Sequence, residues 1–187
     1  VATAFCKKNA GDPIARFNAC AEANDWVQYC DPAGAFVMHE CEELIELWNW
    51  ARGDREIPAR DDLPVRVLKP YLPRLAIAEQ IEKHPPRFKY RLVGTIVTQT
   101  LDERTGQTFD DESATQEQTE RWTHSALLSF ELKKPLRFPI VIQRRMVGEM
   151  LLLPLADDAG EPRFVMAYGR YEPARDWSRR EARAYAS

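Results

Sequence analysis

Four prolines, at positions 58, 64, 70 and 73, divide the chain into two parts with different hydrophobic periodicity. Proline lacks a backbone N–H and fixes φ, so no long helix or central strand can cross residues 54–73. Apolar residues before this segment follow the spacing of helices, whereas those after it alternate along short runs. The sequence therefore predicts helices first and a sheet afterwards, joined by a segment with at most one helical turn near residues 64–68.

Two helices are predicted ahead of the proline-rich segment. Asp12-Pro13 has the acid and the proline that begin a helix, and Asp31-Pro32 marks a stop, so the first helix is expected over about residues 13–30. The second is expected over residues 36–53, with Gly53 as its C-cap. Its apolar stripe consists of Val37, Cys41, Leu44, Ile45 and Trp48. This second helix has one clear face to bury.

After the prolines, the sequence predicts five strands. The runs Leu75–Ile81 and Phe88–Leu92 flank a proline-containing turn and form a hairpin. A brief helix near residues 96–101 follows, and then a helix of about 18 residues that starts with the capping-box spacing of Ser113 and Gln116 and ends at Lys133-Lys134-Pro135. Three more strand-like runs occupy residues 136–145, 146–156 and 163–171.

This order of elements predicts an α+β domain with a five-stranded antiparallel sheet and the internal helices on its inner face. Leu151–Leu153 and Val165–Ala167 are apolar at consecutive positions, so the outer face needs a cover as well. The N-terminal helical extension and the helix at 36–53 are expected there. The predicted boundaries are an N-terminal helical extension at 1–35, the domain at 36–175 and a charged C-terminal tail at 176–187.

Composition excludes several classes of protein. The 187 residues carry 26 basic and 29 acidic side chains, and the net charge of −3 gives no basic excess for a nucleic-acid backbone. The longest apolar stretch, Met150–Ala156, is far shorter than the roughly 20 residues that cross a bilayer, and the first residues lack a signal peptide's apolar core. We therefore expect a cytoplasmic protein with no nucleic-acid or membrane partner.

The cysteines exclude a zinc site by their spacing. Cys6, Cys20, Cys30 and Cys41 include no C-x-x-C pair, and only His39 lies close to one of them. Free and mostly buried thiols are expected. Two disulfides are the alternative if the protein is exported.

Six short motifs occur in one order along the chain: Leu47-Trp48 with Arg52-Gly53, Ile57-Pro58-Ala59-Arg60-Asp61, Leu68 to Leu72-Pro73, Phe88-Lys-Tyr-Arg-Leu-Val-Gly-Thr95, Thr105-Gly106, and Leu152-Leu-Pro-Leu-Ala-Asp157. Through them, residues 48–172 resemble the family of short, stand-alone PAS-like proteins found mainly in alphaproteobacteria. The resemblance implies a PAS-like fold and a sensory, regulatory or protein-interaction module of a bacterial signalling pathway.

A candidate ligand pocket is predicted between the inner sheet face and the helix near residues 114–133. Its residues are Phe88, Tyr90, Leu92, Trp122, Phe130, Met166 and Tyr168. Any ligand is expected to be small, apolar and non-covalently bound. The resemblance also implies that no ligand is bound covalently. PAS light sensors attach their chromophore to a cysteine inside the core, whereas all four cysteines of this chain lie at or before position 41. The alternative is that these side chains only fill the core.

Haem is a cofactor that the resemblance raises. Haem-binding PAS sensors usually take a histidine from the longer helix, where this chain has His124. At about 100° per residue, His124 falls outside the stripe of Trp122, Ala126 and Phe130, so an edge or solvent position is expected. Neither His39, in the outer helix, nor His84, in the turn, is expected to be a pocket ligand. No cofactor is therefore expected.

A small α+β isomerase or hydrolase is the alternative function. The chain has no phosphate-binding loop and no G-x-S-x-G or H-E-x-x-H motif. Glu79 shares the parity of inward-facing residues, so burial could raise its pKa and make it an acid/base group, with Tyr90 or Tyr168 as hydrogen-bond donor. The simpler interpretation is that Glu79 pairs with an arginine near the strand end.

A homodimer is predicted from apolar residues outside the helical stripes. Leu47 and Trp50 lie away from the stripe of the 36–53 helix, and the first helix adds Phe17, Trp26, Val27 and Tyr29. PAS-like domains, by the resemblance, often pair through helices that flank the sheet. The alternative is that residues 13–30 fold back and cover Trp50 within a monomer. A separate signalling protein is a further candidate partner.

Overall fold

The computed structural model describes residues 11–173 except 27, 102 and 143–145. Its helical elements are α1 (Pro13–Ala23), α2 (His39–Arg52), η1 (Arg60–Asp62), α3 (Val65–Leu68), η2 (Leu72–Arg74), α4 (Thr98–Leu101) and α5 (Gln116–Leu132). Its strands are β1 (Leu75–Lys83), β2 (Pro86–Val93), β3 (Leu136–Ile142), β4 (Met146–Ala156) and β5 (Pro162–Pro173). Helices precede the proline-rich segment and strands follow it, as predicted, and the segment itself holds only short turns.

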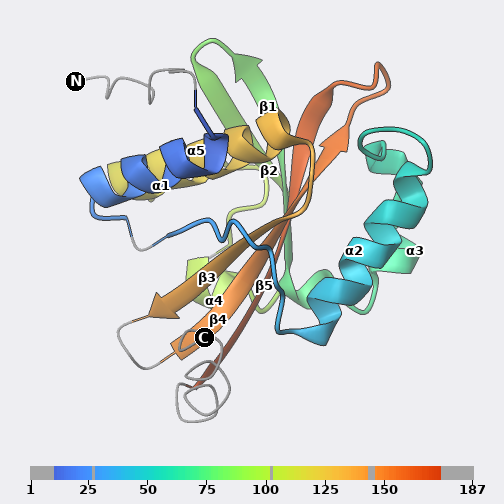
Figure 1. The fold of residues 1–187 in the computed structure, drawn as a ribbon, viewed down its shortest axis with the longest axis horizontal. Helices are drawn as coiled ribbons and strands as arrows, with labels where there is room; N and C mark the ends of the chain where they lie inside the picture. Colours follow the sequence, from blue (N-terminus) through green and yellow to red (C-terminus); the bar gives the residue numbers. More distant parts are fainter. Residues whose placement is uncertain (1–10, 27, 102, 143–145, 174–187) are drawn as a thin grey trace.

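The strands form one antiparallel sheet in the order β2-β1-β5-β4-β3. Between β2 at one edge and β3 at the other, the chain passes through α4 and α5. Figure 1 shows α1 and α5 on one side of the twisted sheet and α2 and α3 on the other. The predicted α+β fold with a five-stranded antiparallel sheet is confirmed.

Each face of the sheet carries its own apolar core. On one face, α2 packs through Cys41, Leu44 and Trp48, and the Trp48 indole N–H donates to the carbonyl of Pro154 (2.9 Å). We call this the α2 core. On the other face, the α5 core contains Ala126 and Leu128 of α5. The predicted cover of the outer face by the second helix is therefore confirmed.

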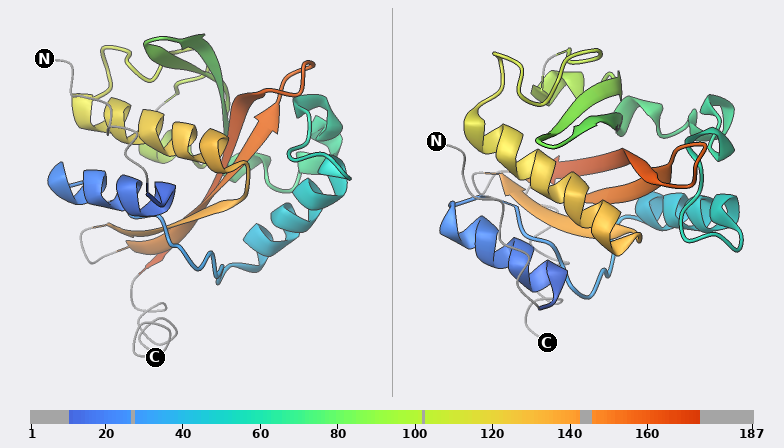
Figure 2. Two further views of the ribbon diagram at one scale, coloured as in Figure 1. Left: turned by 45° about the horizontal axis from the view of Figure 1, so that its top comes forward. Right: turned by 90° about the horizontal axis from the view of Figure 1, so that it is seen from above.

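The N-terminal extension lies elsewhere than predicted. Its helix α1 buries Ile14, Phe17 and Ala21 in the α5 core, and Figure 2 shows α1 and α5 side by side. The prediction that the extension covers the outer face is wrong for α1. The physical reason is that α1 packs beside β3, where the ring of Phe17 meets that of Phe138 edge-on with centroids 5.6 Å apart.

The first helix is also shorter than the predicted span of 13–30. It ends at Ala23 because Asp25 takes a positive φ of 52° and the backbone N–H of Trp26 returns to the carbonyl of Ala21 (2.9 Å). Trp26 is thereby turned into the α5 core. The chain then pairs Asp31 with Arg137 at the edge of β3 and continues to α2 on the opposite face. This passage covers a sheet edge that would otherwise be open.

The hairpin of β1 and β2 contains a bulge that decides which face its side chains occupy. Ala78 pairs with Tyr90, but the preceding residue of β1, Ile77, pairs with Leu92, so Arg91 is an extra residue on β2. An extra residue reverses the alternation of a strand. Tyr90 therefore lies in the α5 core and Leu92 against the α2 core.

The predicted limits of the longer helix are right at its end and wrong at its start. Thr115, not Ser113, is the N-cap, and Thr115 and Gln118 exchange the two hydrogen bonds of a capping box, each 3.1 Å long. Lys133 ends the helix with a φ of 50°. The predicted stop at the Lys-Lys-Pro sequence is confirmed.

The cysteines differ from one another. Cys30 and Cys41 are free and buried, as predicted, whereas Cys20 is disulfide-bonded, so the expectation of free thiols is wrong for Cys20. Cys6 lies outside the described residues. Among the described residues, no helix is long and apolar enough to cross a membrane.

Candidate ligand site

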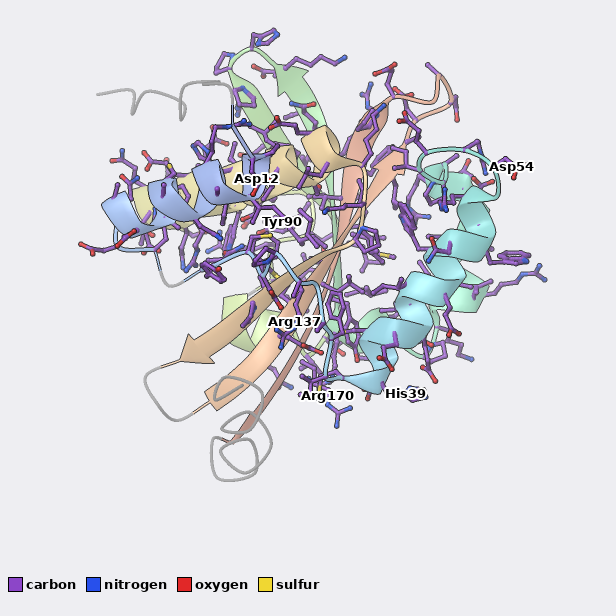
Figure 3. All side chains as sticks on the ribbon, in the orientation of Figure 1. Asp12, His39, Asp54, Tyr90, Arg137 and Arg170 are labelled. Atoms are coloured by element: carbon purple, nitrogen blue, oxygen red, sulfur yellow. The ribbon has the colours of Figure 1, made fainter. Side chains whose placement is uncertain are left out.

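Four of the seven predicted pocket residues lie together in the α5 core: Phe88, Tyr90, Trp122 and Phe130. Phe109, from the loop before α5, contacts three of them, and Phe130 contacts the ring of Phe88. The Phe109 ring stacks on Phe88 with centroids 5.3 Å apart and lies 4.8 Å from Tyr90 and 5.9 Å from Trp122. Figure 3 marks Tyr90 in this layer. These rings occupy the space under α5 in which the sequence predicts a pocket.

The other three predicted residues, Leu92, Met166 and Tyr168, lie on the opposite face with the α2 core. The bulge at Arg91 moves Leu92 there. Met166 pairs with Ile77, and Tyr168 with Leu75, both of which face α2. The prediction of one pocket containing all seven residues is therefore wrong for these three.

An open cavity lies at the edge of the α5 core, in a groove between α1, α5 and the tip of the β1–β2 hairpin. Its volume is about 710 Å³. The apolar lining includes Phe17 of α1 and Leu127, Leu128 and Phe130 of α5. We call it the α1–α5 groove. Phe130 is the one predicted pocket residue among those that line it.

Polar groups surround this apolar floor. Arg16 of α1 donates to both carboxylate oxygens of Glu131 of α5, at 2.8 and 2.9 Å, and both residues line the groove. Gln80 and Lys83 of β1 line the hairpin side. Since the Arg16 and Glu131 charges neutralise each other, Lys83 gives this rim a net positive charge.

Two of the three histidines lie at the groove. His124 is half-buried at the edge of α5, with its ring centroid 5.3 Å from that of Trp26, and burial lowers the pKa of His124. The edge position agrees with the sequence analysis. His84, in the hairpin turn, also lines the groove. His39 lies on α2 and is exposed.

Glu79, the candidate acid/base group, is held between two arginines. The Nε atoms of Arg163 and Arg91 donate to its two carboxylate oxygens at 2.8 and 2.5 Å. Burial acts to raise the pKa of Glu79, but these hydrogen bonds outweigh it and lower the pKa. The interpretation of Glu79 as an arginine partner is confirmed, and its pKa shifts opposite to what a general base at this site requires.

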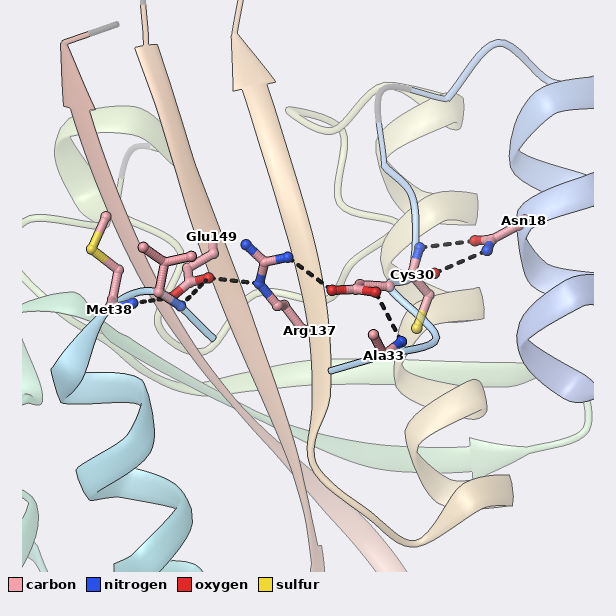
Figure 4. A network of polar contacts seen from close by, with 8 residues as sticks. Asn18, Cys30, Ala33, Met38, Arg137 and Glu149 are labelled. Carbon is pink, nitrogen blue, oxygen red and sulfur yellow. Dashed lines mark hydrogen bonds and ion pairs between the residues drawn. The ribbon is translucent and has the colours of Figure 1, made fainter. Parts of the chain in front are cut away.

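A series of polar contacts connects α1 with the edge of the sheet. The side-chain amide of Asn18 donates to the carbonyl of Cys30 (2.9 Å), and its oxygen accepts from the Cys30 N–H (2.8 Å). The next residue, Asp31, accepts from Nη1 of Arg137 on β3 (2.8 Å). Figure 4 shows these contacts.

The same series continues to the start of α2. Arg137 Nε donates to Glu149 of β4 (2.7 Å), and Glu149 accepts from the backbone N–H groups of Val37 (3.0 Å) and Met38 (2.6 Å). Glu149 is fully buried and Arg137 is 5% exposed. One wall of the groove is thus joined through the sheet to the helix on the opposite face.

Sequence reasoning misses several residues of the site. Phe109 stands alone among polar residues between the two predicted internal helices. Its N–H nevertheless donates to the carbonyl of Phe88 (3.0 Å), so Phe109 lies beside β2. No periodicity marks it. Phe17 and Leu127 are recognisable as apolar helix residues, but their meeting depends on the docking of α1 beside α5. Within the described part of the chain, no three metal-ligating side chains come together.

Comparison with known proteins gives one family. A family model described as PAS domain matches residues 37–168. No curated protein and no solved structure matches the chain. The match begins just before α2, so α1 and its wall of the groove lie outside it.

Proposed function

The chain belongs to the PAS domain family, whose members act as sensory or interaction modules, and on this premise we propose that it senses a small molecule in the α1–α5 groove. The ligand class is a molecule with an apolar body, bound without a covalent bond. The output is a signal to a protein partner in a cytoplasmic bacterial pathway, without catalysis by this chain.

The observation that carries the proposal is the size and lining of the groove. A volume of about 710 Å³ lies within the range of small-molecule sites, about 300–1,000 Å³. Its floor is apolar and its polar groups surround that floor, which suits a molecule whose body is apolar. Lys83 at the rim favours an anionic end on that molecule.

The enzymatic alternative has less support at Glu79. A general base needs a carboxylate that can take up a proton near the working pH. Both oxygens of Glu79 accept from arginines, and its pKa is lowered. A sensory module therefore accounts better for this chain than an isomerase or hydrolase that uses Glu79.

The predicted homodimer now depends on fewer residues. Phe17 and Trp26 are buried within their own chain, which removes much of the apolar surface expected on the first helix. Val27 lies outside the described residues. Trp50 on α2 is 75% exposed, so α1 does not cover it. The homodimer remains a prediction, and light scattering of the full chain at micromolar concentration tests it.

Decanoate is a suitable first probe because it combines an apolar body with a carboxylate. We expect a saturable rise in the melting temperature of the full chain with decanoate concentration, since binding to the folded state stabilises it. Leu127→Trp, which fills the groove, should abolish the rise. Leu47→Trp is the matched control, because Leu47 is also a half-buried helical leucine but packs beside the α2 core.

A rise that persists in Leu127→Trp, or that disappears equally in Leu47→Trp, would place the binding elsewhere. No response of the wild-type chain to decanoate, naphthoate or a metabolite library, together with no co-purified molecule in native mass spectrometry, would remove the proposed sensing function.

A further inference from the structure

A second cavity lies between η1 and the turn that joins β4 to β5. Its volume is about 460 Å³. The backbone N–H of Ala156 donates to the carbonyl of Pro58 (2.8 Å), and this contact holds the segment before η1 beside the end of β4. Figure 1 shows the turn between β4 and β5 next to the segment that follows α2. We call this cavity the η1 cavity.

Two of the six sequence motifs that carry the PAS resemblance meet at the η1 cavity. The motif Ile57–Asp61 supplies Arg60 and Asp61, and the motif Leu152–Asp157 supplies Asp157. Neither motif lines the α1–α5 groove. All residues that line the η1 cavity lie within the residues 37–168 that match the PAS domain model. The function proposed for the groove therefore makes no use of these two motifs.

One part of the cavity lining is cationic. Arg60 donates to the carbonyl of Leu63 (3.1 Å) and forms no ion pair with any residue that the structure describes. Arg163 shares the carboxylate of Glu79 with Arg91, so one carboxylate balances two guanidinium groups. Guanidinium groups bind carboxylates through directed N–H donors. Arg60 and Arg163 can therefore hold the carboxylate of a ligand.

Acidic side chains line the same cavity. The turn itself engages Asp157, because the Asp157 carboxylate accepts from the backbone N–H groups of Ala159 (3.0 Å) and Glu161 (3.1 Å). Asp61 and Asp158 are exposed and form no ion pair within the described part of the chain. These two carboxylates can therefore hold a cationic group such as an ammonium.

The ring of Phe164 adds an apolar surface, since it lines the cavity and is half-buried beside the α2 core. Charges of both signs in one cavity disfavour a ligand with a single charge, because the groups of the same sign repel it. A molecule that carries both an ammonium and a carboxylate pairs with both sets of groups. The volume of about 460 Å³ lies within the range of small-molecule sites, about 300–1,000 Å³.

We propose that the η1 cavity binds a small zwitterion, namely an α-amino acid with an apolar side chain. The carboxylate of the amino acid pairs with Arg60 and Arg163, and its ammonium pairs with Asp61 and Asp158. Its side chain packs on the ring of Phe164. This site is separate from the α1–α5 groove, so the inference does not depend on the function proposed for the groove.

L-Leucine is a suitable probe because it carries both charges and an apolar side chain. We expect a saturable rise in the melting temperature of the full chain with L-leucine concentration, since binding to the folded state stabilises it. N-Acetyl-L-leucine lacks the ammonium, and L-leucinamide lacks the carboxylate. Each should bind weaker than L-leucine by about tenfold or more in isothermal titration, because a bond to a charged group is lost. Equal affinities of the three compounds, or no response of wild type to L-leucine, L-phenylalanine or L-methionine, would overturn the proposal.

The carboxylate side of the site is tested with Arg60→Gln. This variant should bind L-leucine about tenfold more weakly and should change the affinity for L-leucinamide far less, since L-leucinamide has no carboxylate to lose. The matched control is Arg66→Gln, at an exposed arginine of α3 outside the cavity, which should bind L-leucine like wild type. Equal losses for L-leucine and L-leucinamide, or an equal loss in Arg66→Gln, would contradict the pairing with Arg60.

The ammonium side is tested with Asp61→Asn/Asp158→Asn. This variant should bind L-leucine about tenfold more weakly and N-acetyl-L-leucine nearly as well as wild type does. Asp54→Asn/Glu112→Gln removes two exposed charges outside the cavity and should leave the binding of L-leucine intact. Leu127→Trp, which fills the α1–α5 groove, should leave it intact as well. An equal loss in the charge control, or a response to L-leucine that disappears in Leu127→Trp, would overturn the proposal, because the amino acid would then bind elsewhere.

Discussion

Nε of Arg137 donates to Oε2 of Glu149 across 2.7 Å, and the Glu149 side chain is entirely buried. The two residues stand on neighbouring strands, β3 and β4. Glu149 also accepts from the N–H groups of Val37 and Met38, while Arg137 reaches Asp31. One ion pair therefore fixes the extension, the sheet and the start of α2 relative to one another.

Removal of the Glu149 charge should destabilise the fold strongly. In Glu149→Gln the Arg137 guanidinium keeps Asp31 but loses its fully buried partner, and breaking a buried pair costs about 3–5 kcal/mol. We expect the free energy of unfolding, measured with urea, to fall by an amount near the lower end of this range. Glu46→Gln, the same change at an exposed position, should stay within about 0.5 kcal/mol. Equal effects of the two substitutions would contradict the buried bridge.

The Glu79 cluster predicts a pH dependence of stability. The folded protein lowers the pKa of Glu79 from its ordinary value of 4.5, so the stabilisation is complete above 4.5 and is lost as pH falls through the folded value. Glu79→Gln should cost about 1–3 kcal/mol at pH 7. The difference from wild type should shrink below pH 4.5. A difference that stays constant down to acid pH would show that the charge of Glu79 contributes nothing.

The order of elements was predictable because its signals are local. Prolines interrupt residues 54–73, alternation marks the hairpin, and Lys133 with the following Lys-Pro ends α5. The faces of the sheet were not predictable in the same way. Along β5, Val165 and Met166 are both apolar yet lie in different cores, so alternation cannot say which one faces α5.

The candidate site depends on contacts that no local pattern contains. The bulge at Arg91 reverses the face of Leu92, although the sequence of β2 reads as a regular alternation. The α1–α5 groove is lined by Phe17 and Leu127, which stand more than half of the chain apart in the sequence. Of the predicted pocket, only Phe130 lines that groove, because Phe88, Tyr90 and Trp122 are used to pack Phe109.

Even the smallest substitution at Gly94 should destabilise the fold. In Gly94→Ala the new Cβ would lie 2.5 Å from the Pro73 carbonyl oxygen and even closer to that of Leu72, so η2 or β2 must shift. A loss of at least about 3 kcal/mol in urea unfolding is expected. Gly160→Ala is the matched control: its Cβ would meet nothing within 4 Å, and only the positive φ of 82° opposes it, at about 1–2 kcal/mol. Equal losses would argue against the close approach of η2.

His124 should make stability fall in mildly acidic solution. Burial lowers its pKa below the ordinary value of 6.5, so the unfolded chain takes up a proton before the folded chain does. The stabilisation is therefore complete above pH 6.5 and decreases as pH falls toward the folded value. His124→Gln should flatten the urea-unfolding free energy between pH 7 and pH 5, compared with His39→Gln as the exposed control. An unchanged slope in His124→Gln would contradict this assignment.

Substitutions of Phe130 and Leu92 distinguish binding in the observed groove from binding in the pocket that the sequence predicts. Both are half-buried members of that predicted pocket, but Phe130 lines the α1–α5 groove and Leu92 packs beside the α2 core. Truncation of either should destabilise the chain by about 2–4 kcal/mol, because each loses apolar contacts. Only Phe130→Ala should also lower the affinity for decanoate, by about tenfold or more, because the lost ring removes part of the apolar floor. Isothermal titration well below the melting temperature of each variant measures this, and an equal change in Leu92→Ala would mean that the probe binds on the α2 face of the sheet.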